Sequence, residues 1–320
     1  MSTSTAGQGL TRARKGVAVR GSGPPLAPRK AGRPGSSKLT LIVFATPALF
    51  LLLLINLYPL LYAGWQSLRD GSLIAAGDFV GLQNYVDVLK DPTFWAAARF
   101  TVVFTVVGVF GSWFVGLALA LLIKTRFPVK NLFKLLLLLP WVVPVVVSAT
   151  AWNWLVATPQ SPLPILAEKL GFGNVLFLAD PLLAKVTVCV FKVWISFPFM
   201  MMMMAAALES VDNNVYEAAK VDGASKWKEL TDITLPMISR STYISWILMT
   251  IFCVNDFPTI FLLTGGGPVN ATQTLVVLSY VTVFQNFQTG PGVAIAFLMT
   301  LVLVVISVAL YRQIKKVQIL

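Results

Sequence analysis

Residues 216–238 read YEAAKVDGASKWKELTDITLPMI, a charged stretch punctuated by Ala and Gly. Two long apolar segments flank it, residues 183–207 and 240–263. Each is long enough to cross a bilayer as a helix, which takes about 20 residues. The sequence therefore predicts that the charged stretch is a polar connector between two membrane spans.

The whole chain has the composition of a membrane protein. It has 320 residues, of which 57% are hydrophobic and 12% are charged, whereas soluble domains are about 25% charged. Lipid offers no partner to unpaired backbone groups, so each long apolar segment is expected to be a helix. We predict an all-α polytopic membrane protein with six transmembrane helices. They are expected at 39–65, 98–123, 132–157, 183–207, 240–263 and 291–313, with Pro140 and Pro144 breaking the third.

The formal net charge of +12 is concentrated on one side of these spans. Residues 1–38 hold eight of the 25 Lys and Arg and no acid, and their Gly, Pro and Ser content predicts a disordered basic tail. Basic residues also gather in 124–134 and at 312–316, while 264–290 carries no charge. Lys and Arg accumulate in cytoplasmic loops, where they also meet anionic lipid. We therefore expect both termini and the quoted stretch to be cytoplasmic, with membrane lipid rather than nucleic acid as a partner.

Several kinds of chemistry are excluded by residue content. The chain has no histidine, which removes His-based acid–base catalysis and His metal ligands. Cys189 and Cys253 lie within apolar segments without metal-ligand spacing, so we expect buried thiols and no metal site. No G-x-x-x-x-G-K-[ST] loop is present to cradle ATP phosphates. We predict no catalytic residue and no cofactor bound by this chain.

The quoted stretch has the signals of two short helices joined by a turn. Asp212 or a neighbouring Asn can cap the first helix, and Gly223 stands where a helix commonly ends in a left-handed residue. Ser225 can cap the second helix, and Pro236 is expected to mark the start of the next span. These signals predict a helix–turn–helix bracket near the membrane plane. From them alone, a docking element and an ordinary amphipathic connector are equally good interpretations.

A longer pattern carries a family resemblance. The stretch matches EAA-x3-G-x9-I-x-LP without departure, and it resembles the EAA loop of ABC importer permeases. The matching residues are Glu217, Ala218, Ala219, Gly223, Ile233, Leu235 and Pro236. Residues 79–105, 195–201 and 262–268 also resemble elements of the binding-protein-dependent sugar permeases of the maltose/glycerol-3-phosphate type. The resemblance covers nearly all of 39–320 and leaves out the tail.

The resemblance implies a fold, a function and partners. It implies an ABC importer type I permease fold over 39–320, in which a loop at about 208–239 couples to a separate ATPase dimer that binds ATP and Mg²⁺. It also implies a second permease subunit, an extracytoplasmic solute-binding protein and a place in a bacterial or archaeal cell (inner) membrane. The implied cargo is a sugar or oligosaccharide, with glycerol-3-phosphate or another polyol as the alternative. A gated channel and a membrane-embedded enzyme are the competing classes, and an enzyme would need clustered reactive groups in the spans.

Two charged residues inside apolar segments are candidates for the solute pathway, because intramembrane charge is costly and usually faces a cavity. Lys192, Ser196 and Phe199 are spaced i, i+4, i+7 and are expected to share one helix face. Cys253 and Asp256 are expected to share a face of the fifth span. The family resemblance places substrate contacts at Ser196, Phe199, Cys253 and Asp256, although Asp256 departs from the amide that the family often has. A structural Lys192–Asp256 ion pair, or a Lys192 that snorkels outward, is an equally weighted alternative.

Overall fold

The computed structural model describes residues 38–75, 77–125 and 128–317. Over these residues the chain is helical, with an isolated antiparallel bridge between Arg69 and Phe79. The helices are α1 (Lys38–Ser67), α2 (Gln83–Lys90), α3 (Pro92–Val106), α4 (Ser112–Lys124), α5 (Lys130–Val142), α6 (Val145–Val156), α7 (Pro162–Lys169), α8 (Pro181–Glu209), α9 (Asn213–Val221), α10 (Lys226–Lys228), α11 (Leu235–Val254), α12 (Phe257–Leu263), α13 (Leu275–Tyr280) and α14 (Thr289–Val317). Three π-helical turns join them, η1 (Val107–Gly111), η2 (Glu229–Thr234) and η3 (Val281–Gln285).

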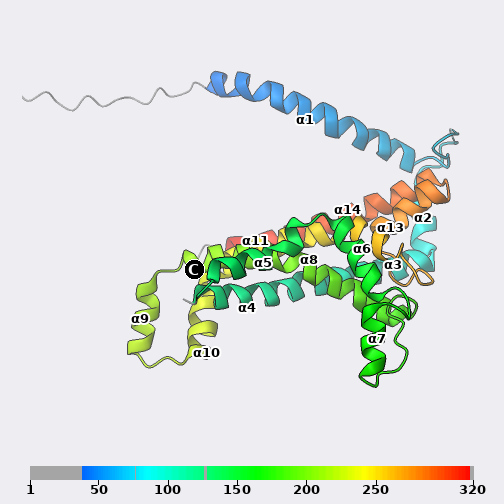
Figure 1. Ribbon diagram of the computed structural model, residues 1–320. Coiled ribbons are helices and arrows are strands. Elements are labelled where there is room, and N and C mark those ends of the chain that lie inside the picture. The colour runs from blue at the N-terminus through cyan, green and yellow to red at the C-terminus, as the bar shows by residue number, and fades with distance from the viewer. Residues whose placement is uncertain (1–37, 76, 126–127, 318–320) are drawn as a thin grey trace, which may run out of the picture. The chain divides into compact units, whose positions relative to one another are not determined.

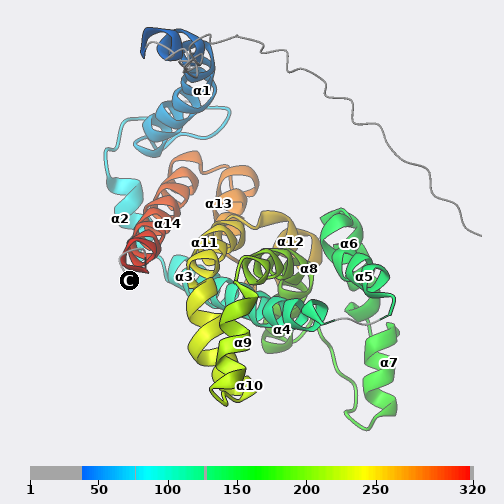
Figure 2. The same ribbon diagram turned by 90° about the vertical axis from the view of Figure 1, so that its left-hand side faces the viewer.

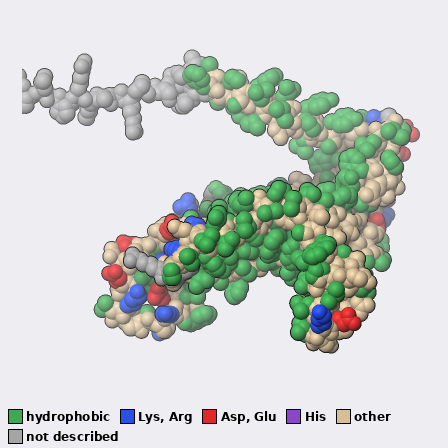
Figure 3. Space-filling view, viewed as in Figure 1, with side chains coloured by type: hydrophobic (Ala, Val, Ile, Leu, Met, Phe, Trp, Pro, Cys, Tyr) green, Lys and Arg blue, Asp and Glu red, His purple; other side chains and the backbone are tan. Residues whose placement is uncertain are grey.

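The chain divides into two compact units, residues 1–55 and residues 56–320. The first contains the beginning of α1, and the predicted disordered tail lies outside the described residues apart from Lys38, which begins that helix. The second contains every other helix. Figure 3 shows hydrophobic side chains along the length of the bundle in the second unit, with charged side chains gathered at its ends.

The membrane spans confirm the predicted all-α polytopic fold. Within the part of the chain that the structure describes, five helical stretches are each long and apolar enough to cross a membrane, and a bent pair of helices makes a sixth if it counts as one span. The single spans are Ile42–Ser67, Pro92–Lys124, Pro181–Glu209, Lys226–Val254 and Thr289–Gln313. The bent pair is α5 with α6, and its two axes meet at 92°.

Two predicted spans differ from the observed helices at prolines. In the third span, α5 runs through Pro140, but the chain turns at Val143, which is extended before Pro144. A residue before proline is pushed out of the helical region, so the helix ends there. The fifth span ends early, because α11 stops at Val254 and a separate helix, α12, begins at Phe257. Pro258 cannot donate the backbone hydrogen bond that a continuous helix would need.

Pro236 stands in the first turn of α11, as expected for the entry to the fifth span, but no break separates α11 from the helical turns before it. The helical path is continuous from Lys226 to Val254, and the π turn η2 comes directly before Leu235 and Pro236. Proline removes one hydrogen bond and crowds the carbonyl four residues earlier, and a wider π turn is a common local adjustment to such a defect. The second limb of the bracket is therefore continuous with the fifth span.

The helix α8 lies at the centre of the second unit, against α4, α5, α11 and η1. In both Figure 1 and Figure 2, α4, α8 and α11 run alongside one another. The approach of α4 to α8 is close because Gly116 has no side chain. A Cβ at that position would lie 2.6 Å from the backbone nitrogen of Met201, so the two backbones are in direct contact.

Replacing Gly116 should separate α4 from α8. Gly116→Leu forces a side chain into backbone atoms, and overpacking of this kind costs about 1–3 kcal/mol or more. We expect a clear fall in the temperature at which the detergent-solubilised protein loses its monodisperse gel-filtration peak. The matched control is Ala118→Leu, since Ala118 is exposed on the same helix and should accept the larger side chain. Equal melting temperatures for the two variants would contradict the contact.

Candidate functional site

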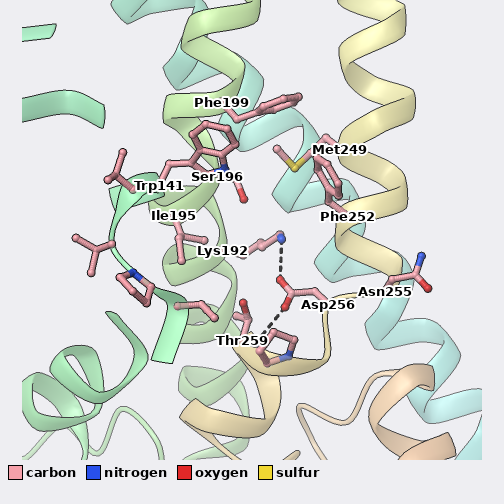
Figure 4. Close-up of a pocket in the computed structure, with 15 residues that line it drawn as sticks. Trp141, Lys192, Ile195, Ser196, Phe199, Met249, Phe252, Asn255, Asp256 and Thr259 are labelled. Carbon is pink, nitrogen blue, oxygen red and sulfur yellow. Dashed lines mark hydrogen bonds and ion pairs between the residues drawn. The ribbon is translucent and has the colours of Figure 1, made fainter. Parts of the chain in front are cut away.

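A cavity of about 440 Å³ lies where the broken spans meet α8. Its wall comes from the α5–α6 bend, the middle of α8, the end of α11 and the start of α12 (Figure 4). The lining residues are Trp141, Val142, Val143, Pro144, Val145, Lys192, Ile195, Ser196, Phe199, Met249, Phe252, Asn255, Asp256, Pro258 and Thr259. Irregular backbone inside a membrane is tolerated where it is buried in protein or lines a cavity. Residues of both helix breaks, the one between α5 and α6 and the one between α11 and α12, line this cavity.

Three aromatic rings form one part of the wall. The Phe199 ring centroid lies 5.9 Å from that of Trp141 and 5.8 Å from that of Phe252. The rings come from α5, α8 and α11, so the aromatic wall joins three helices. In Figure 4 Trp141 and Phe199 lie on the same side of the cavity as Ser196. An apolar wall with a few polar groups is typical of small-molecule sites.

A buried ion pair forms the opposite part of the wall. Lys192 Nζ lies 2.6 Å from Asp256 Oδ2, and the two side chains are 7% and 8% exposed. The other carboxylate oxygen, Oδ1, accepts a hydrogen bond of 3.1 Å from the backbone nitrogen of Thr259 and so caps α12. One carboxylate therefore holds α8 and the N-terminus of α12 together (Figure 4).

The stem of Lys192 reaches Asp256 past a glycine in η1. A Cβ at Gly108 would lie 2.7 Å from Cys253 Sγ and 3.2 Å from Lys192 Cγ. The ammonium also lies 5.9 Å from the centre of the Phe104 ring. Lys192 is thus enclosed among α3, η1, α8 and α12, and its side chain points inward rather than toward the membrane surface.

The sequence-predicted pathway residues lie together with one exception. Lys192, Ser196 and Phe199 all line the cavity from one face of α8, as their spacing predicts. Asp256 lines it too, but from the break after α11. Cys253 is buried in the apolar core and does not line the cavity. The prediction that Cys253 and Asp256 share a helix face is wrong, because α11 ends at Val254.

Sequence reasoning missed most of the wall, including four residues that carry aromatic or polar groups. Trp141 and Phe252 supply aromatic rings, and Thr259 lies beside the ion pair. Asn255 also lines the cavity, but its amide donates to the backbone oxygen of Ile251 and points away from Lys192 in Figure 4. The available signal was the pair of prolines, Pro144 and Pro258, because residues next to a helix break inside a membrane tend to face a cavity.

The second candidate site is the bracket at the end of the bundle. Asp212 caps α9 by accepting from the backbone nitrogen of Asn214 at 2.9 Å. Gly223 has a φ of 75°, and Ser225 Oγ accepts from the backbone nitrogen of Lys228 at 3.3 Å. The predicted cap, turn and second cap are all confirmed. In Figure 1, α9 and α10 stand at one end of the bundle, across the direction of α4, α8 and α11.

The residues of the EAA pattern divide into exposed and packed groups. Glu217, Ala218, Gly223 and Pro236 are exposed. The packed group, Ala219, Ile233 and Leu235, is buried or half-buried at the base of the bracket. Two further apolar side chains are exposed at the tip and were missed from sequence, Val221 at 87% and Trp227 at 71%. Both side chains add exposed apolar surface beside the charged residues of α9 and α10.

Tyr216 ties the bracket to the bundle. Its ring lies 4.0 Å from Lys124 Nζ, at the end of α4, and its hydroxyl lies 3.3 Å from Thr234 Oγ1, in η2. The ring is buried in a cluster that includes Leu208 of α8 and Ile238 of α11. Tyr216 therefore connects α9 to three membrane helices, α4, α8 and α11.

A family model described as "Binding-protein-dependent transport system inner membrane component" matches residues 108–318. The chain belongs to this family. It is 32% identical over 82% of its length, and 86% of the relative, to the sulfoquinovosyl glycerol transport system permease protein SmoG of Agrobacterium fabrum. It is 33% identical over 84% of its length, and 90% of the relative, to the trehalose/maltose transport system permease protein MalF of Thermococcus litoralis.

The fold is also similar to a solved structure. A chain in the crystal structure of a bacterial ABC transporter involved in importing the acidic polysaccharide alginate superimposes with a TM-score of 0.75. The superposition covers 87% of this chain and 96% of that one, at 19% identity. The superposition confirms the predicted permease fold, and the family match and the relatives confirm the predicted permease function. The protein is a multi-pass inner-membrane permease subunit of an ABC importer, and not an enzyme.

Breaking the buried ion pair should destabilise this permease. Lys192→Met leaves the Asp256 carboxylate buried without its partner, which costs about 3–5 kcal/mol for pairs of this kind. We expect a large fall in the thermal stability of the purified protein, followed by gel filtration after heating. The double variant Lys192→Met/Asp256→Asn removes both charges and should recover most of the loss. Equal stability of the single variant and the unmodified protein would contradict the buried pair.

Proposed function

We propose that this permease subunit moves a sugar or oligosaccharide across the membrane. The cavity carries the proposal, because it sets three aromatic rings opposite the Lys192–Asp256 pair, with the Ser196 hydroxyl beside the rings. A sugar ring presents C–H faces that suit an aromatic wall and hydroxyls that suit Ser196, Lys192 and Asp256. The relatives support a saccharide cargo, since their names refer to sulfoquinovosyl glycerol and to trehalose or maltose.

A phosphate-bearing polyol such as glycerol-3-phosphate is the alternative cargo. It would need a cation free to bind the phosphate, and Lys192 is the one cation in the cavity wall. That cation is already paired with Asp256 at 2.6 Å. The ion pair therefore favours a saccharide over a phosphorylated polyol.

The partners of the proposed importer follow from the two ends of the bundle. A separate ATPase dimer, which binds ATP and Mg²⁺, docks against the exposed face of α9 and the tip at Val221 and Trp227. A second permease subunit completes the pathway, as the family resemblance implies. The extracytoplasmic solute-binding protein delivers cargo at the end that carries α7. These assignments deepen the family description, which names dependence on a binding protein.

The proposed orientation places both termini and the bracket in the cytoplasm of a bacterial or archaeal cell. Its support is the distribution of Lys and Arg, which gather in 1–38, 124–134 and 312–316. Lys124, next to the anchor Tyr216, belongs to this basic group. Within the second unit, Lys124 thus lies at the bracket's end of the bundle, whereas α13, which belongs to the uncharged stretch 264–290, lies at the opposite end in Figure 1.

Damage to the bracket should uncouple transport from ATP hydrolysis. Glu217→Ala removes an exposed charge of α9, and Gly223→Pro imposes a negative φ where the turn needs 75°. We expect both variants to lose uptake and cargo-stimulated ATPase activity by at least about tenfold, which corresponds to about 1.4 kcal/mol. Membrane insertion, followed by membrane fractionation, should be unchanged.

The matched control for these variants is Glu209→Ala. Glu209 is an exposed carboxylate at the same end of the bundle, at the end of α8 and outside α9. It should keep normal coupling. Normal coupling in both Glu217→Ala and Gly223→Pro would refute the docking role of α9.

Removing the central aromatic ring of the cavity should weaken cargo binding. Phe199→Ala takes away the ring between Trp141 and Phe252, and aromatic contacts of this kind contribute about 0.5–1.5 kcal/mol. We expect the KM of uptake to rise roughly five- to tenfold, since about 1.4 kcal/mol corresponds to a factor of ten. Phe114→Ala is the control, because Phe114 is 70% exposed on α4 and does not line the cavity. An unchanged KM for Phe199→Ala would exclude the ring from the pathway.

A further inference from the structure

The wall of the cavity contains one cation and one anion, and they are paired with each other. All fifteen lining residues are described by the structure, and Lys192 and Asp256 are the charged ones among them. Their contact of 2.6 Å brings the net charge of the wall to zero. The question that this raises is whether the pair only stabilises the fold or also decides which cargo can enter.

Both partners keep unused hydrogen-bonding capacity. An ammonium group has three donors, and within the described residues Lys192 Nζ donates to Asp256 alone. A carboxylate has about four acceptor sites, and Asp256 accepts from Lys192 and from the Thr259 backbone. A solute hydroxyl can therefore accept from Lys192 and donate to Asp256 at the same time. A carboxylate or phosphate group on the solute can only accept, so it would meet the Asp256 charge without a donor.

The pair is fixed at both ends, so it cannot easily part to admit an anion. Asp256 is held by the N-terminus of α12 through its contact with Thr259. The stem of Lys192 lies against Gly108, close to Cys253, and cannot withdraw into that space. An anionic solute would have to compete with a carboxylate that the backbone already positions, and like charges in a poorly hydrated site repel strongly.

We propose that Asp256 masks the charge of Lys192 and thereby makes the cavity selective for uncharged polyhydroxy solutes. The proposal rests on the proposed function, because it takes the cavity to be the cargo pathway. It assigns Asp256 a specificity role: the carboxylate excludes anionic sugars by repulsion and by occupying the cation that would bind them. Removing this carboxylate should convert the cavity into a site that prefers anionic sugars.

The test compares two solutes that differ in one group, methyl α-glucopyranoside and methyl α-glucopyranosiduronate. Binding to the purified assembly of both permeases and the ATPases, without the solute-binding protein, is measured by saturation-transfer difference NMR. We expect Asp256→Asn to bind the uronate at least about tenfold more tightly than the unmodified protein. Asp256→Ser is the second variant, since serine also caps helices well and preserves the start of α12 if the amide does not.

The matched control is the double variant Lys192→Met/Asp256→Asn, which removes the cation as well. It should show no gain in uronate binding, and the gain in the single variants should shrink as salt is raised. Uronate affinities that are equal in the unmodified protein, Asp256→Asn and Asp256→Ser would overturn the proposal. So would an equal gain in the double variant, because the gain would then not depend on Lys192.

A different experiment tests the proposed function, the transport of a saccharide. If the complete importer in proteoliposomes takes up none of a panel of neutral mono- and disaccharides presented with its own solute-binding protein, the saccharide assignment is wrong. Uronate binding by the Asp256 variants is measured without uptake or that protein. The two outcomes are therefore read independently.

Discussion

The ion pair between Lys192 and Asp256 joins the parts of the bundle that a membrane would otherwise leave unsupported. Lipid provides no partner for the backbone groups freed where a helix ends, so a break inside the bilayer needs a substitute. At the break after α11 that substitute is the Asp256 carboxylate, which caps α12 with one oxygen and binds α8 through the other. The cavity lies at this break, and the aromatic rings of α5, α8 and α11 form another part of its wall.

The same helices connect the cavity to the bracket. The helix α8 carries Lys192 and Phe199 at the cavity and Leu208 at the base of α9, and α11 carries Phe252 at one end and Ile238 at the other. Tyr216 packs α9 against α8 and α11 and against the end of α4. Close packing between α4 and α8 at Gly116 stiffens the connection between the bracket and the cavity. Tightly packed protein interiors have low compressibility and therefore transmit displacement. Movement of α9 thus has a short route to the walls of the cavity.

Much of this organisation follows from local rules that a sequence obeys directly. Apolar length predicted the spans, and the caps Asp212 and Ser225 with Gly223 predicted the bracket, since these are short-range effects. The i, i+4, i+7 spacing placed Lys192, Ser196 and Phe199 on one face because α8 is an unbroken helix there. The errors came at prolines, where the outcome depends on tertiary packing: Pro140 lies inside α5 although a break was expected there, and the helix ends before Pro258 although one continuous fifth span was expected. Because the helix ends at Val254, Asp256 does not lie on the same helix face as Cys253. The contacts of Phe199 with Trp141 and Phe252 depend on how α5, α8 and α11 pack together, which residue spacing along one helix does not give.

We propose that nucleotide-driven movement of α9 changes access to the cavity, and the account of transport depends on this coupling. It is tested most directly by a thiol at Asn255, which is exposed at the helix break, in a chain whose Cys189 and Cys253 are replaced by Ala. The alkylation rate with a membrane-impermeant reagent is measured from each side of proteoliposomes holding the complete importer. With Mg-ATP and vanadate, the rate from the cytoplasmic side should fall and the rate from the outer side should rise. Rates from both sides that do not change with nucleotide would contradict the account.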